Sequence, residues 1–427
     1  MKKFVTKFIG ATTAAALSTV TLAQGTNTLV NAASKPTEIS FWHGQTGVYQ
    51  EELDKQIKEF NDSQSKYKVV GTSQGNYTTL QQKITAAAKS KTLPVLAQAV
   101  YTQVPDYVNN GIVKDLDAQL NGKDGLSKKQ QANIYPGFLD SSKYKGKFYS
   151  MPFSVSVRVM FYNKTLLKQY GVDVPKTWDD IQKLAEKVKG TDVAALGFDQ
   201  SFDMEWNGMV RAAGKSLVTK NFKSNIASKQ AVAAADAINK MVKDGTAKTA
   251  GSDIYGTNNF VNGKTILSYS SSAGVSATKA QAPEGFEWGT AAIPSYKGKH
   301  ATQLAGNSLV VTSTATKKQT AGAWAFMKFL ASDKQTEAWA EATGYLPITK
   351  KATNSKSYKA YLKANPLAAG GADSLKYAFT DTPFLGYNEY RTDLVTMTSN
   401  ILTKDEAPKK ALKTLDSQVK TLLKANK

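Results

Sequence analysis

The sequence predicts an exported α/β protein built from two domains, and three observations lead to this prediction. Short runs of alternating or continuous apolar residues are followed repeatedly by segments with helical apolar spacing, so strands and helices alternate along the chain. The chain has 427 residues, more than one domain of ordinary size holds. Its N-terminus has the charge and hydropathy pattern of a secretory signal.

The predicted signal peptide covers residues 1–33. Lys2, Lys3 and Lys7 form a basic start, an uncharged apolar run follows over 8–23, and small residues suited to cleavage follow at 30–33. Cleavage is expected after Ala32 or Ala33. The run is too short for a membrane span, and no later stretch reaches the ~18 apolar residues that a span needs. We therefore expect a secreted, extracellular protein, associated with the cell surface.

Cysteine is absent from the chain. This excludes disulfides, thiolate metal sites, cysteine nucleophiles and a lipid-anchored N-terminus. Removing the three signal lysines from the formal net charge of +21 leaves +18 for the exported part. A charge of this size favours contact with polyanions, and for an exported protein the anionic cell wall is the available one. The basic residues are scattered, so a nucleic-acid partner is not expected.

The first domain is predicted from a regular strand–helix order that is typical of a mostly parallel sheet. The expected strands lie at 38–43, 66–73 and 94–101, and the expected helices at 48–62 and 77–90.

The second half of the chain continues the same pattern. The expected strands lie at 147–163, 264–272, 290–299 and 307–314, and the expected helices at 177–190, 228–245, 317–332, 333–344 and 407–427. Thr177 is the predicted N-cap of the first of these helices, and Asp180 suits the positive end of its dipole. Gly344 is the predicted C-cap of the helix over 333–344.

The fragment "LPIT" at 346–349 is similar to the start of a sortase anchor. The next residue is Lys350, where that signal needs glycine, and the C-terminal helix has no hydrophobic tail. We therefore reject the anchor. Gly344 ends a helix, Pro347 prevents its continuation, and Tyr345 is expected to be displayed on the turn between them.

The sequence offers no set of residues for catalysis. The chain has two histidines, His43 and His300, and neither a cysteine nor a histidine pair at helical spacing, so a zinc site is not expected. "SATK" at 276–279 matches the first motif of penicillin-interacting enzymes, but the partner motifs are missing. No catalytic residue, metal or cofactor is expected. "SSSAG" at 270–274 instead lies between a strand and a helix, where hydroxyl and backbone N–H groups suit an anion.

Aromatic residues are plentiful and suit sugar or polyol binding. Trp324 and Trp339 lie in predicted helices and are expected in the core. For Trp42 and Trp206 the core and a ligand face remain open alternatives.

Several motifs together indicate a family. They are, in chain order, "ISFWHG", "GNYTTLQQKI", "MPFSVSVRVMFYNKTLL", "VPKTWDDI", "FVNGKTILSYSSSAG", "GNSLVV" and "ATGYLPITKKA". With them the chain resembles the extracellular solute-binding proteins of ABC importers, and most of all their glycerol-3-phosphate-binding branch. The resemblance implies a monomeric type II clamshell of the periplasmic-binding-protein kind, with the ligand cleft between two lobes. The implied N-lobe is 34–147, completed by about 304–346, and the C-lobe is 148–303, completed by about 347–427.

The resemblance also implies the ligand residues and the partners. The family's contact positions fall on Tyr77, Ser156, Ser271, Gly306, Tyr345 and Arg391. One position departs: the family has a glutamate that holds glycerol hydroxyls, where this chain has Thr102 beside Gln103. The implied function is the capture of glycerol 3-phosphate, or of a glycerophosphodiester, for delivery to an ABC permease.

Three alternatives stay open at this stage. Arg391 could form a surface ion pair with Glu389 or Asp393. The ligand could be a neutral sugar or oligosaccharide. The protein could also be a basic surface protein or adhesin held electrostatically on the wall.

Overall fold

A computed structural model gives the structure of residues 35–426, which form an α/β fold on a ten-stranded sheet with the strand order β2-β1-β3-β11-β6-β9-β7-β8. In addition, β10 pairs with β6 and β12 with β11, and β4 and β5 form a separate hairpin. The strands are β1 (Thr37–His43), β2 (Tyr67–Ser73), β3 (Leu96–Val100), β4 (Lys143–Tyr144), β5 (Lys147–Phe148), β6 (Ser150–Asn163), β7 (Ala194–Phe198), β8 (Ala247–Thr249), β9 (Thr265–Ser271), β10 (Trp288–Ala292), β11 (Thr302–Val311) and β12 (Ala378–Phe379).

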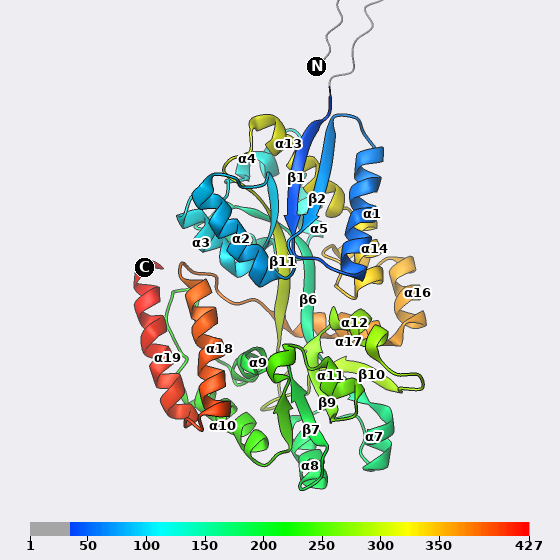
Figure 1. Cartoon of the computed structure of the whole chain (residues 1–427), viewed down its shortest axis with the longest axis vertical. Coiled ribbons are helices and arrows are strands. Elements are labelled where there is room, and N and C mark those ends of the chain that lie inside the picture. Colours follow the sequence, from blue (N-terminus) through cyan, green and yellow to red (C-terminus); the bar gives the residue numbers. More distant parts are fainter. Residues whose placement is uncertain (1–34, 427) are drawn as a thin grey trace, which may run out of the picture. The chain divides into compact units, whose positions relative to one another are not determined.

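Two long strands, β6 and β11, connect the two parts of this sheet. The first half of β6 pairs with β11, and its second half pairs with β9 and β10 (Figure 1). The outer strands are parallel to their neighbours, as expected, whereas β11 is antiparallel to both β3 and β6, and β6 is antiparallel to β9. We call the part on β1, β2 and β3 the first lobe and the part on β7, β8 and β9 the second lobe.

Helices cover both lobes. Those that pack in the first lobe are α1 (Val48–Asp62), α2 (Tyr77–Ser90), η1 (Tyr101–Gln103), α3 (Val104–Asn109), α4 (Asp117–Asn121), α5 (Lys128–Asn133), α6 (Pro136–Ser141), α13 (Lys317–Leu330), α14 (Asp333–Thr343), α15 (Lys350–Thr353) and α16 (Lys356–Ala364). Those that pack in the second lobe are α7 (Lys164–Gln169), α8 (Trp178–Val188), α9 (Asp203–Ala212), α10 (Lys229–Lys243), η2 (Gly251–Asp253), α11 (Thr257–Val261), α12 (Gly274–Gln281), α17 (Pro366–Ser374), η3 (Leu375–Tyr377), α18 (Tyr387–Thr403), α19 (Pro408–Leu423) and η4 (Lys424–Asn426). The lobe boundaries given above stay a prediction.

The predicted helix ends follow from their capping residues. Thr177 accepts a hydrogen bond from the backbone N–H of Asp180, and the two form a capping box at the start of α8. Gly344 closes α14 in the left-handed conformation, with a φ of 77°. Both predictions are confirmed. The strand expected at 290–299 is wrong beyond Ala292, because Pro294 cannot donate to a strand ladder and 296–299 form a turn.

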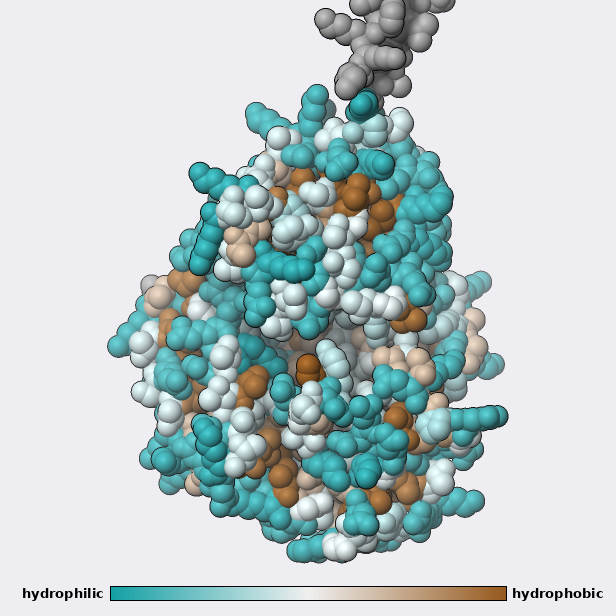
Figure 2. Space-filling view, viewed as in Figure 1, coloured by the Kyte–Doolittle hydropathy of each residue, from teal (hydrophilic) through white to brown (hydrophobic). Residues whose placement is uncertain are grey.

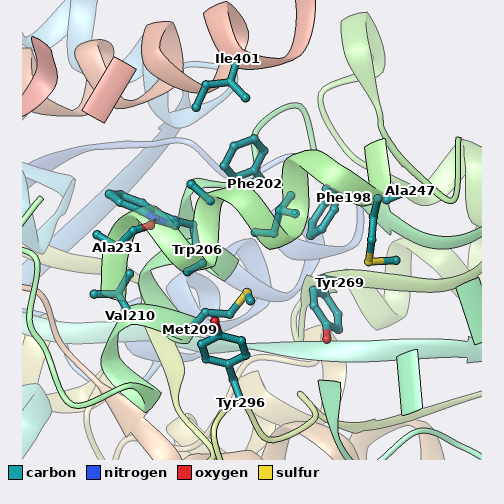
Figure 3. Close-up of a cluster of buried hydrophobic side chains, with 14 of the residues drawn as sticks. Phe198, Phe202, Trp206, Met209, Val210, Ala231, Ala247, Tyr269, Tyr296 and Ile401 are labelled. Atoms are coloured by element: carbon teal, nitrogen blue, oxygen red, sulfur yellow. Dashed lines mark hydrogen bonds between the residues drawn. The ribbon is translucent and has the colours of Figure 1, made fainter. Parts of the chain in front are cut away.

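Each lobe has its own core. In the second lobe Phe198, Phe202 and Trp206 are fully buried and point into one cluster (Figure 3). The indole of Trp206 also donates to the carbonyl of Ala231 at 2.8 Å, so the core alternative holds for this residue. Trp324 and Trp339 lie in the core of the first lobe, as predicted. Trp42 packs, half-buried, beside a smaller cluster in the same lobe.

The expected signal peptide lies outside the described residues. Among the helices of residues 35–426, none combines the length and the apolar composition that a membrane crossing needs. The same residues bring together no group of three or more His, Asp or Glu side chains that could hold a metal ion.

Candidate functional site

A cleft of about 1210 Å³ is lined by residues of both lobes, and a hollow is visible on the face shown in Figure 2. All seven residues predicted from the sequence to contact the ligand line this cleft, although they come from seven different elements or loops. They are Tyr77, Thr102, Ser156, Ser271, Gly306, Tyr345 and Arg391. Their contact with a ligand stays a prediction.

Two tyrosines meet at the first-lobe side of the cleft. The hydroxyl oxygens of Tyr77 and Tyr345 lie 3.1 Å apart. Tyr77 also accepts hydrogen bonds from the side-chain amides of Gln45 at 2.9 Å and Asn307 at 2.6 Å. Because both amides donate to Tyr77, its own proton is available for Tyr345, and the proton of Tyr345 is then free for a ligand oxygen.

Burial keeps these phenols neutral. It raises the pKa of Tyr77 to about 12 and the pKa of Tyr345 well above 10. The two hydroxyls therefore act as hydrogen-bonding groups, without charge, at any pH near neutrality.

The position of Tyr345 follows from the end of α14. The left-handed Gly344 turns the chain, and the ring of Tyr345 then stacks on Trp339 with centroids 5.9 Å apart. Tyr49 meets the same ring edge-on at 6.1 Å. Tyr345 is only 8% exposed, so packing on both sides fixes its hydroxyl in the cleft. The sequence analysis expected a turn to display Tyr345; the residue follows the helix end as expected, but it is buried and lines the cleft.

Gly306 lies on β11, where this strand pairs with Val155 of the antiparallel strand β6. Its φ is +127°, and a Cβ at this position would lie 1.9 Å from the carbonyl oxygen of Ser154. Ser156 is paired with Ala305 in the same ladder and is buried. Glycine is therefore required here by the approach of the two strands, whatever its role toward a ligand.

Ser271 ends β9 just before α12, as the strand–loop–helix prediction required. Its hydroxyl accepts a hydrogen bond from the backbone N–H of Ala273 at 3.2 Å. Thr102 lies in η1 and is buried at the cleft wall. The neighbouring Gln103 also lines the cleft, and its amide donates to Gln81 at 2.8 Å.

Arg391, on α18, forms an ion pair with Asp203 at the start of α9. The alternative pairing with Glu389 or Asp393 is therefore wrong. The Arg391 side chain is still 45% exposed. Burial, with the nearby Arg158 guanidinium, lowers the pKa of Arg391 to about 10, so the side chain stays charged at neutral pH. It can offer donors to a ligand anion.

Sequence reasoning missed several polar residues of the cleft. The carboxylate of Asp381 accepts hydrogen bonds from Asn207 at 2.8 Å, Gln303 at 2.5 Å and Tyr387 at 2.8 Å. These four residues line one part of the cleft. Asp381 lies in an irregular loop after β12, where no periodic pattern marks it.

Tyr255 is the second omission. It lies on the loop between η2 and α11 and lines the cleft with 63% of its surface exposed. The preceding Ile254 has a φ of +64°, which is rare for a β-branched residue. The loop is held by the backbone N–H of Gly256, which donates to Asp199 at 3.0 Å. An exposed ring on a restrained loop is a surface that a ligand can cover.

Comparisons with known proteins agree with this geometry. The family model for bacterial extracellular solute-binding proteins matches residues 55–366. The sn-glycerol-3-phosphate-binding periplasmic protein UgpB of Brucella melitensis is 29% identical over 357 residues, which are 79% of this chain and 81% of that protein. Its namesake in Escherichia coli is 27% identical over 382 residues, 84% of each chain.

Solved structures show the same fold. UgpB from Mycobacterium tuberculosis in complex with glycerophosphocholine has a TM-score of 0.81 at 21% identity and covers 92% of this chain and 99% of that one. The GacH receptor of Streptomyces glaucescens, solved unliganded and with acarbose, has a TM-score of 0.80 at 20% identity, with 91% and 99% covered. These similarities confirm the two-lobed binding-protein fold predicted from the sequence.

Proposed function

The chain belongs to the family of bacterial extracellular solute-binding proteins, and from this premise we propose that it captures glycerol 3-phosphate or a glycerophosphodiester for an ABC permease. The family is non-catalytic, and its members are the solute-binding components of ABC importers. The proposal therefore concerns the solute, the residues that hold it and the manner of retention at the cell.

The observation that carries the proposal is the guanidinium of Arg391, which lines the cleft and keeps 45% of its side chain exposed although it is paired with the carboxylate of Asp203. Among residues 35–426, Arg391 is the only basic side chain in the cleft lining. A guanidinium can donate two parallel hydrogen bonds to a phosphate, and each bond to a charged group contributes ~1.5–3 kcal/mol. With a few hydroxyl donors this supports micromolar binding, which needs about −8 kcal/mol.

The proposed arrangement gives each part of the solute its own partners. Arg391 and Ser271 hold the phosphate, with Ser156 and the backbone at Gly306 nearby. The hydroxyls of Tyr77 and Tyr345 serve the glycerol end. The names of the UgpB relatives and the glycerophosphocholine complex of one of them support this choice of solute.

A neutral sugar or oligosaccharide is the second candidate. The cleft volume of about 1210 Å³ exceeds what glycerol 3-phosphate fills, and the exposed ring of Tyr255 suits a sugar face. The structural similarity to a protein solved with acarbose also supports it. The two candidates differ in their need for Arg391, because a neutral sugar has no charge for it to neutralise.

Titration calorimetry of the mature protein separates the candidates. The ligands are glycerol 3-phosphate, glycerophosphocholine and maltotriose, at moderate salt. Saturable one-to-one binding of a phosphate compound is the expected result. Binding of maltotriose alone would replace the proposed solute with an oligosaccharide and remove the role of Arg391.

We further propose that the charge of +18 holds the protein at the anionic cell surface, since no cysteine is present for a lipid anchor. Washing cells with molar salt should then release it. Protein that stays on the cells after this wash would contradict electrostatic retention, and the solute assignment would be unaffected.

A further inference from the structure

Asp203 occupies the phosphate side of the cleft together with Arg391. Its carboxylate contacts the Arg391 guanidinium and also accepts a hydrogen bond from the hydroxyl of Ser201 at 2.6 Å. The Asp203 side chain is only 5% exposed, so it is fixed, whereas 45% of the Arg391 side chain is exposed. An anion that binds Arg391 must share the guanidinium with this carboxylate or displace it.

Carboxylates outnumber cations in the whole cleft lining, which also disfavours a solute with more than one negative charge. Within the part of the chain that the structure describes, one guanidinium and four carboxylate residues line the cleft; the carboxylates are Asp203, Asp253, Asp381 and Glu389. The exported chain as a whole carries +18, so its basic character lies outside the cleft. Like charges within a few ångströms of one another repel, most strongly where water is scarce.

We propose that Asp203 is a specificity-determining residue that sets the charge of the accepted solute. A phosphodiester carries one negative charge, whereas glycerol 3-phosphate carries close to two above a pH of about 6. The Arg391–Asp203 pair can satisfy a monoanion by sharing the guanidinium. A dianion adds a second negative charge beside Asp203, and the nearby guanidinium of Arg158 is already paired with Asp199 and Glu205. The cleft therefore prefers a glycerophosphodiester to glycerol 3-phosphate.

A purely structural role for Asp203 makes a different prediction. As the first residue of α9 it also favours the positive end of that helix dipole. Losing that contribution would lower the melting temperature. It would not improve the binding of any ligand, so a gain of affinity separates the two roles.

The test compares Asp203→Asn with Asp244→Asn in the full mature protein. Asp244 is a carboxylate of the same lobe that pairs with Lys240 at 2.6 Å and does not line the cleft. Both variants and the wild type are titrated at pH 8 with glycerol 3-phosphate, glycerophosphoglycerol and glycerophosphocholine. We expect Asp203→Asn to tighten glycerol 3-phosphate about tenfold and the diesters less than about threefold, and Asp244→Asn to leave the ratio unchanged.

The proposal rests on the proposed function, and the two fail differently. If the wild type binds none of the three compounds, the phosphate assignment itself is overturned. If the wild type binds a diester and Asp203→Asn leaves the ratio of affinities unchanged, only the role of Asp203 is overturned. Should Asp203→Asn not fold, Asp203→Ser removes the same charge and keeps a short polar side chain, and it must show the same change of ratio.

Discussion

Replacing Arg391 by alanine tests the phosphate site through its one cation. Two hydrogen bonds to a phosphodiester at the lower value of ~1.5 kcal/mol contribute about 3 kcal/mol. When the phosphodiester binds, the guanidinium loses part of its interaction with Asp203, which reduces this gain. An ion pair with one exposed partner contributes at most about 1 kcal/mol. The net loss is about 2 kcal/mol, which corresponds to a roughly 30-fold weaker Kd.

Titration calorimetry with glycerophosphocholine measures this loss, and two further variants define it. Arg391→Lys keeps the charge but not the planar fork, so its affinity should lie between those of the wild type and the alanine variant. Lys420→Ala removes a cation that pairs with Asp416 on α19, outside the cleft, and should change the Kd less than about twofold.

Folding is checked separately, by thermal unfolding of each variant. Asp203 keeps the hydrogen bond from Ser201 in Arg391→Ala, so the variant should remain folded, with a free energy of unfolding lower by ~1–3 kcal/mol. A folded Arg391→Ala protein that binds glycerophosphocholine as tightly as the wild type would refute the reasoning.

Three further predictions concern the rest of the cleft and the first-lobe sheet. Tyr255→Ala should weaken solute binding by about 2–10-fold in calorimetry, the loss expected when one aromatic contact is removed. The free energy of unfolding should not change, because the ring is exposed. An affinity equal to that of the wild type would show that Tyr255 does not contact the solute. Gly306→Ala should lower the free energy of unfolding by more than ~3 kcal/mol in urea, because its Cβ would overlap the Ser154 carbonyl. Gly137→Ala, with open space around it, should cost under ~0.5 kcal/mol, and similar losses in both variants would contradict the argument from the close approach of β11 and β6. Burial lowers the pKa of His43 to about 4, so on acidification the imidazole is protonated in the unfolded chain at a higher pH than in the folded protein. The free energy of unfolding should therefore fall by ~2–3 kcal/mol between pH 7 and pH 4.5. In urea melts His43→Asn should lack this decrease, and a pH dependence identical to that of the wild type would exclude His43 as its source.

The helices with one apolar face were predictable from sequence, and those buried all round were not. The helix over 48–62 shows a clear apolar stripe at Leu53, Ile57 and Phe60, and the structure has it at Val48–Asp62. Helix α9 is buried on nearly every side, including its polar residues Asp203 and Asn207, so no periodic stripe marks it. This helix places Asp203 and Asn207 in the lining of the cleft.

The direction of the central strands also lay beyond local patterns. Strand–helix alternation correctly indicates the parallel outer strands, but β6 and β11 are joined to their partners through long stretches of chain that cross between the lobes. The antiparallel centre depends on these connections, and no short-range signal in the sequence specifies them.

The seven predicted ligand residues were identified from the resemblance to a family, whereas the contacts among them could be described only from the structure. The alternative that paired Arg391 with Glu389 or Asp393 considered only its sequence neighbours, whereas the actual partner, Asp203, is 188 positions away in the chain. Tyr255 lies on a loop, where exposure and backbone conformation reveal its position and periodicity does not. Long-range pairs and loop positions are the features that composition and spacing could not supply.

A crystal structure of the mature protein grown with glycerophosphocholine tests the central claim most directly. The account predicts one solute molecule in the cleft, with phosphate oxygens within hydrogen-bond distance of Arg391 and Ser271, and the glycerol hydroxyls beside Tyr77 and Tyr345. A solute bound elsewhere in the cleft, with the Arg391–Asp203 pair undisturbed, would contradict it.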